Sequence, residues 1–225
     1  MSFVSACLTK TKAWIKTIAE ARKNRYLQQK RKRLKNTGVS VIANDCIGGV
    51  TCHDLGLRFL SPTVNLFFET DDDYFTYLED LAYYNQAEPV LTDRPEVSYP
   101  VGQMEYQDRK TVIHFMHYPT FENAKQKWME RGKRVNYDNL LIIWHYPSVN
   151  EQAGALYQRF QSLPFKNKII VTRHAFPYSG EHIYKLNVYE KDYFHGKVLE
   201  YKSVLSKKRY SDDVPFVDII NRCGQ

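Results

Sequence analysis

The chain has 225 residues, of which 43% are apolar and 25% charged, a balance that excludes a wholly disordered chain and a coiled coil. Four cysteines in this length do not make a disulfide framework, and no stretch approaches the roughly 20 apolar residues of a membrane span. The net charge of +7 is unevenly placed, because residues 1–36 hold 11 Lys/Arg and one acid while the remainder is mildly acidic. A basic nucleic-acid face spread over the whole fold is therefore disfavoured.

The amino-terminal segment predicts an amphipathic helix over residues 3–21, followed by a polybasic run from Arg22 to Lys35. An apolar helix face beside clustered Lys/Arg is typical of a helix on an anionic membrane surface, so residues 3–35 are a candidate membrane contact. Two alternatives stay open: a helix packed on the body, and contact with nucleic acid. Interleaved lysines disfavour a secretory signal. Wound at 100° per residue, the apolar side chains fall within about 160°: Phe3, Val4, Cys7, Leu8, Trp14, Ile15 and Ile18.

Strand and helix patterns alternate through most of the remaining chain, which predicts an α/β fold with a mainly parallel sheet covered by helices on both faces. The clear boundary lies near residue 37, so we expect a basic amphipathic helical head over 1–37 and an α/β domain over 38–225. Residues 86–109 are rich in Pro and predict loops with one short strand near Val90. Strands are expected at 39–43, 63–68, 110–118, 140–144, 168–172 and 182–188, and helices from Asp71 and at 121–131, 151–163 and 214–222.

The run Asn44-Asp45-Cys46-Ile47-Gly48-Gly49 follows the first predicted strand. Ligands of open α/β sheets bind beyond the carboxyl ends of strands, and paired glycines would permit positive φ and close approach of the backbone. An ordinary tight turn explains the run equally well. Cys46 is either a reactive thiolate at a helix start or a small buried apolar residue.

Two histidines and a basic cluster supply further candidates. His114 and His117 would point to opposite faces of a strand, so a shared metal ion is disfavoured and none is expected. Either histidine could act as an acid or a base, or be a hydrogen-bonded core residue. Arg131 and Arg134, with Asn136 beyond, could clamp a phosphate or carboxylate, or could only complement the helix dipole.

These stretches resemble a bacterial family labelled domain of unknown function 1919, whose members are often described as exopolysaccharide biosynthesis proteins. The resemblance covers about residues 38–175 and is most specific from Asn44 to Phe68. Ile47 stands where relatives usually have an aromatic residue, and Trp144-His-Tyr-Pro147 replaces their usual acids. Further matches are Asp54-Leu-Gly-Leu, Ser61-Pro-Thr63, Tyr99-Pro-Val-Gly102, His114-Phe-Met-His-Tyr118, Ala124 through Trp128 to Arg131-Gly-Lys-Arg-Val-Asn136, and Lys166-Asn-Lys.

The resemblance implies a cytoplasmic α/β protein that works on cell-surface polysaccharide, by modifying a sugar nucleotide or a lipid-linked glycan. The leading hypothesis is a transferase of exopolysaccharide or capsule synthesis, with a glycosyl, acyl or phosphoryl group as the group transferred. The basic head, which lies outside the resemblance, would attach the protein peripherally to the inner membrane face. The alternatives are a non-catalytic scaffold at the membrane and, less favoured, a nucleic-acid-associated protein. The sequence does not identify a cofactor. The hypothesis expects all candidate segments to converge on one cleft. Its catalytic candidates are Asp45, His114 and His117, and its substrate-binding candidates are Asn44, Cys46, Gly48, Gly49, Arg131, Arg134 and Asn136.

Overall fold

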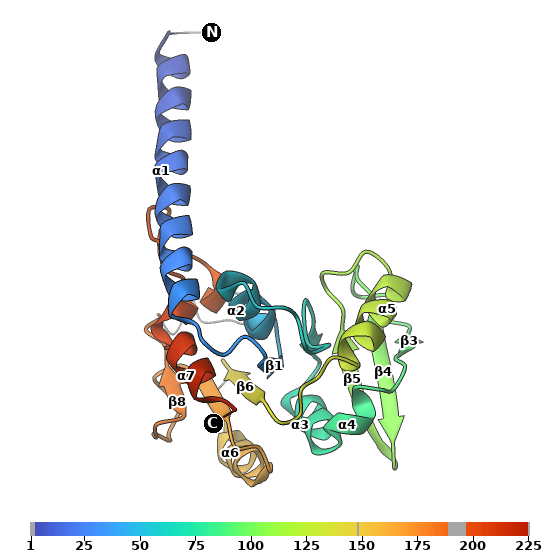
Figure 1. Ribbon diagram of the computed structural model, residues 1–225. Helices are drawn as coiled ribbons and strands as arrows, with labels where there is room; N and C mark the ends of the chain where they lie inside the picture. Colours follow the sequence, from blue (N-terminus) through green and yellow to red (C-terminus); the bar gives the residue numbers. More distant parts are fainter. Residues whose placement is uncertain (1–2, 148, 189–196, 225) are drawn as a thin grey trace.

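The computed structural model describes residues 3–147, 149–188 and 197–224. Its first sheet is parallel, with four strands in the order β1-β6-β7-β8 (Figure 1). Short apolar runs form the three longer strands, as predicted, because β-branched side chains favour the extended backbone. The strands are β1 (Ser40–Ala43), β6 (Leu140–Tyr146), β7 (Lys168–Thr172) and β8 (Ile183–Lys185).

Alternate side chains of the parallel strands enter two different hydrophobic clusters. Ile42, Ile142 and Ile170 lie in one cluster with aromatic residues of α3 (Asp71–Glu79) and α6 (Ala153–Ser162). Val41 and Ile143 lie in the other, with apolar residues of α2 (Ile47–Leu55) and α7 (Phe216–Arg222). This alternation follows from the two-residue period of a strand.

The second sheet is antiparallel, with the order β2-β5-β4-β3, and it lies between β1 and β6 in the sequence. The expected parallel sheet is therefore present, but the sequence did not predict the antiparallel sheet that accompanies it. Val101–Tyr106 forms a strand where loops were expected, and it pairs with the strand Arg109–His114. A two-residue turn connects the two strands at Gln107 and Asp108, both of which have positive φ. The elements are β2 (Phe67–Phe68), α4 (Leu81–Tyr84), β3 (Val90–Thr92), β4 (Val101–Tyr106), β5 (Arg109–His114) and α5 (Phe121–Gly132).

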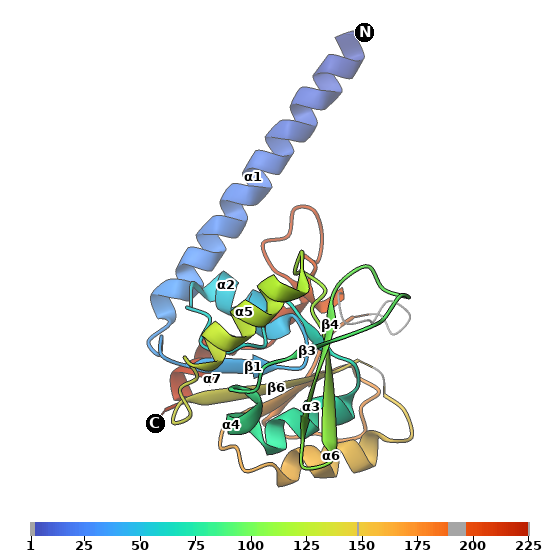
Figure 2. The same cartoon turned by 90° about the vertical axis from the view of Figure 1, so that its right-hand side faces the viewer.

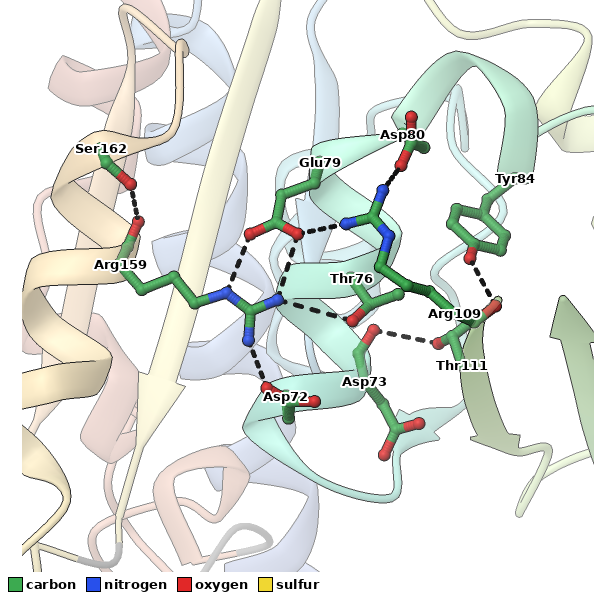
Figure 3. Close-up of polar contacts among 10 residues, drawn as sticks. All are labelled: Asp72, Asp73, Thr76, Glu79, Asp80, Tyr84, Arg109, Thr111, Arg159 and Ser162. Carbon is green, nitrogen blue, oxygen red and sulfur yellow. Dashed lines mark hydrogen bonds and ion pairs between the residues drawn. The ribbon is translucent and has the colours of Figure 1, made fainter. Parts of the chain in front are cut away.

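A charged network on α3 joins the two halves of the body (Figure 3). Arg159 of α6 donates to both oxygens of Glu79, at 2.8 and 3.1 Å, and also pairs with Asp72. Glu79 accepts in addition from Arg109 of β5 at 2.6 Å, and Arg109 pairs with Asp80. One helix thus holds arginines from both the parallel-sheet layer and the antiparallel sheet.

Helix α1 (Phe3–Arg33) is continuous through the polybasic run, so the helix does not end near residue 21 as expected. Figures 1 and 2 show its amino-terminal part extending away from the rest of the molecule. Its carboxyl-terminal part is anchored, because Lys30 pairs with Asp212 at 2.5 Å and Arg33 with Asp218 at 2.9 Å. No helix among the described residues is long and apolar enough to cross a membrane. The boundary near residue 37 stays a prediction.

Two 3-10 turns, η2 (Lys197–Leu199) and η3 (Tyr210–Asp213), complete the carboxyl-terminal part of the chain. Between them Tyr201 and Arg209 form an isolated antiparallel bridge. Lys23 of α1 lies 3.9 Å from the centre of the Tyr201 ring. The segment therefore packs against the middle of α1.

Candidate functional site

The carboxyl end of β1 is joined to β6 by Asn44. Its side-chain amide donates to the carbonyl of His145 at 2.8 Å, and its side-chain oxygen accepts from the His145 backbone N–H, also at 2.8 Å. The carbonyl of Asn44 accepts from Phe68 of β2 at 3.0 Å. Both side-chain atoms of this candidate substrate ligand therefore bond β6 of the same sheet, and its backbone carbonyl bonds β2 of the other sheet.

Asp45 forms a buried pair with His145. Nδ1 of His145 lies 2.5 Å from Oδ2 of Asp45, and the imidazole is fully buried. The other oxygen of Asp45 accepts from the backbone N–H of Ile47 at 2.9 Å, which caps the start of α2. The carboxylate therefore fixes the histidine ring and the helix start together. His145 carries no signal of this role in the sequence, because it lies within an apolar strand and contacts Asp45 only through the adjacency of β1 and β6.

Gly48 and Gly49 lie in the first turn of α2, not in a turn with positive φ. A Cβ at Gly48 would lie 3.0 Å from the Cβ of Ala43, and one at Gly49 would lie 3.2 Å from Cγ1 of Val64. The positive φ that paired glycines permit is not adopted at Gly48 and Gly49, and the positive-φ glycines among the described residues are Gly56 and Gly224. The paired glycines allow α2 to pack closely on β1 and on the segment before β2.

Cys46 precedes α2 and is partly buried, with its Sγ 3.7 Å from the carbonyl oxygen of Leu66. Burial and the neighbouring Asp45 together raise the pKa of this thiol to about 12, although the hydrogen bond to Leu66 opposes the rise. A thiol with this pKa stays protonated near neutral pH, so the geometry does not favour a reactive thiolate.

Arg131 lies in a separate cluster with Tyr118. Its Nη1 donates to the Tyr118 hydroxyl at 2.7 Å, and that hydroxyl donates to the carbonyl of Val64 at 2.8 Å. Burial raises the pKa of Tyr118, Arg131 opposes that rise, and Cys46 lies near enough to add to it. Arg131 is thus brought towards the Cys46 side of the molecule.

Arg134 and Asn136 do not join that cluster. Arg134 lies 3.7 Å from Glu130 of the preceding helix. Asn136 bonds Ser40 through its backbone and the carbonyl of Gly38 through its side chain, at 2.8 and 3.2 Å. Both contacts are at the amino end of β1, whereas Asn44 follows the carboxyl end of that strand.

His114 lies on the antiparallel sheet, and His117 lies in the turn that follows it. His114 ends β5 and stacks on Phe67 with ring centres 4.5 Å apart, and its Nε2 lies 3.7 Å from Glu69. Burial lowers the pKa of His114, while Glu69 raises it. His117 is exposed in the following turn. The structure therefore gives His114 its own surroundings rather than a place beside Asp45.

The carboxyl edge of the parallel sheet gathers more polar groups than the sequence indicated. Nε1 of Trp144 donates to Asp71 at 2.7 Å, and Tyr74 donates to the carbonyls of Ile42 and Ile143. Burial raises the pKa of Tyr74 well above its ordinary value, and both Asp45 and Asp71 contribute to the rise. The two carboxylates therefore lie at the same edge.

Tyr146 and Arg173 extend this group along the edge. Burial raises the pKa of Tyr146, the hydrogen bond with Asn150 opposes the rise, Asp71 adds to it and Arg173 opposes it. In the register of β6 and β7, Tyr146 lies opposite Thr172, the residue before Arg173. Arg173 directly follows β7. We define the candidate site as Asp45, His145, Asp71, Tyr146 and Arg173. Among the described residues, no group of three or more His, Cys, Asp or Glu side chains could hold a metal ion.

Residues 17–221 match the family described as domain of unknown function (DUF1919). The chain belongs to this family. The match begins inside α1 and reaches α7, so it extends beyond the 38–175 range that the motifs indicated. An uncharacterized protein of Haemophilus influenzae (strain ATCC 51907 / DSM 11121 / KW20 / Rd) is similar to the chain, with 36% identity over 201 residues that cover 88% of this chain and 90% of the relative.

Membership of the DUF1919 family extends to part of the head. The last 17 residues of α1, from Thr17 to Arg33, fall inside the matched range, whereas the first 16 residues of the chain precede it. The anchored part of α1 is thus a family element, contrary to the expectation that the resemblance excludes everything before residue 37.

Proposed function

We propose that the protein is a transferase of exopolysaccharide or capsule assembly that acts on a sugar nucleotide or a lipid-linked glycan. The observation that carries this proposal is the buried Asp45–His145 pair at the carboxyl edge of the parallel sheet, with 2.5 Å between Nδ1 and Oδ2. A carboxylate at Nδ1 favours the ring tautomer with its lone pair on Nε2, which suits a general base. The polysaccharide context comes from the resemblance described above.

In this proposal the sheet edge opens around the fully buried His145, and an acceptor hydroxyl then gives its proton to Nε2 of His145 while its oxygen bonds to the transferred group. The bond between that group and the donor's phosphate breaks, and the phosphate leaves with the electron pair. Arg173, at the same edge, offsets the charge on the leaving phosphate. The scheme applies to a glycosyl or a phosphoryl donor. His145 takes the role first considered for His114 or His117, because His114 lies on the other sheet and His117 in the exposed turn after it.

The proposal places the protein at the cytoplasmic face of an anionic membrane, where lipid-linked precursors are available. Trp14 is 66% exposed on the extended part of α1, and Trp is favoured at membrane interfaces. Lys30 and Arg33 already pair with acids of the body. The contact is therefore assigned to the amino-terminal half of α1 rather than to the whole range 3–35.

A non-catalytic scaffold at the membrane is the second candidate function. It is favoured by the complete burial of His145 and by the use of both Asn44 side-chain atoms in backbone hydrogen bonds. In that case the Asp45–His145 pair would serve only to hold β1, β6 and α2 together.

The decisive experiment compares His145→Gln with His53→Gln in the full chain, since the side chain of His53 is 73% exposed. Nucleotide or phosphate release would be measured over a panel of sugar nucleotides with lipid-linked acceptors, beside polymer production in cells. We expect His145→Gln to lower turnover by at least about 100-fold and His53→Gln to retain it. Absence of donor consumption, together with normal polymer from His145→Gln cells, would reject the transferase and leave the scaffold.

A further inference from the structure

A hollow of about 660 Å³ opens beside the candidate site, at the amino ends of α3 and α6. We call it the α3–α6 hollow. Its wall includes Asp71 and Asp72 of α3, Tyr146 at the end of β6, and Gln152, Leu156 and Arg159 of the α6 side. Neither the motifs nor the family assigns any role to this place.

The charges around the hollow disfavour an anionic ligand. Its arginine is already engaged, because Arg159 donates to both oxygens of Glu79 and pairs with Asp72 (Figure 3). The amino end of a helix ordinarily attracts anions, but α3 begins with three aspartates of its own, residues 71–73. A phosphate entering the hollow would therefore meet carboxylates before it met an uncommitted cation.

The remaining groups suit a ligand rich in hydroxyl groups. The side chains of Asp72 and Gln152 are exposed, and the Tyr146 hydroxyl donates to Asn150 at 2.8 Å. A carboxylate accepts several hydrogen bonds and a side-chain amide both accepts and donates, while Leu156 supplies an apolar wall. Few directed polar groups on a largely apolar wall are typical of small-molecule sites.

We propose that the α3–α6 hollow binds the uncharged pyranose ring of a saccharide. This inference rests on the proposed function and deepens it, because it assigns the acceptor sugar to a hollow that shares Asp71 and Tyr146 with the candidate site. Tyr146 belongs to both the hollow and the candidate site, so a sugar bound there lies at the carboxyl edge of β6.

Trp144 provides a direct readout of occupancy. Its side chain is fully buried, and its Nε1 donates to Asp71 of the hollow at 2.7 Å. A sugar hydroxyl that donates to Asp71 alters the carboxylate that accepts from the indole N–H of Trp144. The chemical shift of that N–H then changes. The indole signal is followed in ¹H–¹⁵N spectra of the full-length protein, assigned with Trp14→Phe and Trp128→Phe.

The titration uses the methyl glycosides of glucose and galactose, N-acetylglucosamine, glucuronate and spermidine. We expect a saturable shift of the Trp144 signal with at least one neutral sugar, and binding of glucuronate at least about tenfold weaker than that of glucose, because its carboxylate meets Asp71 and Asp72. Ala155→Trp fills the hollow and should abolish the shift. Gln158→Trp, at an exposed position of α6 outside the wall, should retain it.

Absence of a saturable shift with every neutral sugar overturns the proposal, as does tighter binding of glucuronate or spermidine than of all of them. An equal effect of the two tryptophan variants also counts against it. Failure of the proposed function looks different: no donor is consumed, yet the neutral sugar still shifts the Trp144 signal. If only the saccharide proposal for the α3–α6 hollow is wrong, the donor is still consumed in a reaction that depends on His145, but no neutral sugar shifts the Trp144 signal.

Discussion

The imidazole of His145 and the carboxylate of Asp45 form a buried hydrogen bond of 2.5 Å between the ends of two adjacent parallel strands. The two residues are 100 positions apart in the sequence, and the whole antiparallel sheet is inserted between them. The pair therefore reports whether β1 and β6 are correctly assembled.

Removal of the carboxylate should destabilise the fold. Asp45→Ala leaves Nδ1 of His145 buried without this hydrogen-bond acceptor. It also removes the acceptor of the Ile47 backbone N–H at the start of α2. We expect the free energy of unfolding to fall by about 2–3 kcal/mol, measured by urea denaturation. Asp93→Ala, at an exposed position, should change it by less than about 0.5 kcal/mol. Equal effects of the two variants would contradict the assigned hydrogen bond.

A substitution of Gly132 tests the close packing of α5 on Asn85, which follows α4. A Cβ at this position would lie 1.9 Å from the carbonyl oxygen of Asn85. Because backbone must move to relieve that clash, Gly132→Ala should cost at least about 3 kcal/mol of unfolding free energy. At Gly154 of α6 the nearest atom is the Tyr178 hydroxyl at 3.2 Å, so Gly154→Ala should be neutral or gain up to about 1 kcal/mol. A stable Gly132→Ala protein would refute this packing.

The parts of the fold that sequence predicted are those specified locally. The apolar runs of β1, β6 and β7 indicate strands by composition alone. The start of α3 is also readable, since Thr70 caps the helix and Asp73 returns a bond to the Thr70 backbone, at 3.0 Å each. Such a capping box needs only a few neighbouring residues.

The antiparallel sheet was not readable in the same way. Its tightest turn uses Gln107 and Asp108 at positive φ, where Asn-Gly or Asp-Gly would have signalled a hairpin. The alternation of apolar residues does not show whether a strand runs parallel or antiparallel to its neighbours, so the sequence of β5 was compatible with a parallel sheet. His145 was missed for a related reason: only the order β1-β6 places it against Asp45.

The Arg159–Glu79 contact should couple α6 to α3 measurably. Both side chains are about 70% buried, at 28% and 29% exposure, and the contact uses two hydrogen bonds. A double-mutant cycle of Arg159→Ala and Glu79→Ala should give a coupling energy of about 1 kcal/mol that decreases with added salt. The single-turn pair Lys127–Glu130 should give less than about 0.5 kcal/mol. A coupling no larger than in this control would show that the network of Figure 3 adds nothing to stability.

His114 should make the fold less stable in mild acid. Burial lowers the pKa of His114, and Arg94 lowers it further against the opposing Glu69 and Asp73. The unfolded chain therefore binds this proton at higher pH than the folded chain does. The unfolding free energy should fall as pH drops below the ordinary histidine pKa of about 6.5, towards the lowered folded value.

Urea titrations at about pH 7 and pH 5 would check this sign. His114→Phe should lose less stability between these two conditions than the unmodified protein, because it removes one group with a lowered folded pKa. His117→Phe, at an exposed position, should follow the unmodified protein. The assignment fails if His117→Phe flattens the dependence as much as His114→Phe does.

Trp14 offers a test of the membrane contact proposed for α1. It is 66% exposed, whereas Trp128 and Trp144 are buried, so a change in solvent-exposed emission reports on the extended part of the helix. Vesicles containing phosphatidylglycerol should shift the fluorescence of the full chain to shorter wavelength, and vesicles of phosphatidylcholine alone should not, because basic residues near an anionic surface add about 1 kcal/mol each. The shift should weaken as salt is raised.

Two variants separate the fluorescence signal from the binding itself. Trp14→Phe should remove the fluorescence shift but change co-sedimentation with the anionic vesicles by no more than severalfold. Lys16→Glu should reduce the fraction of protein that sediments with those vesicles. Equal binding to neutral and anionic vesicles, or none to either, would exclude an electrostatic membrane role for α1.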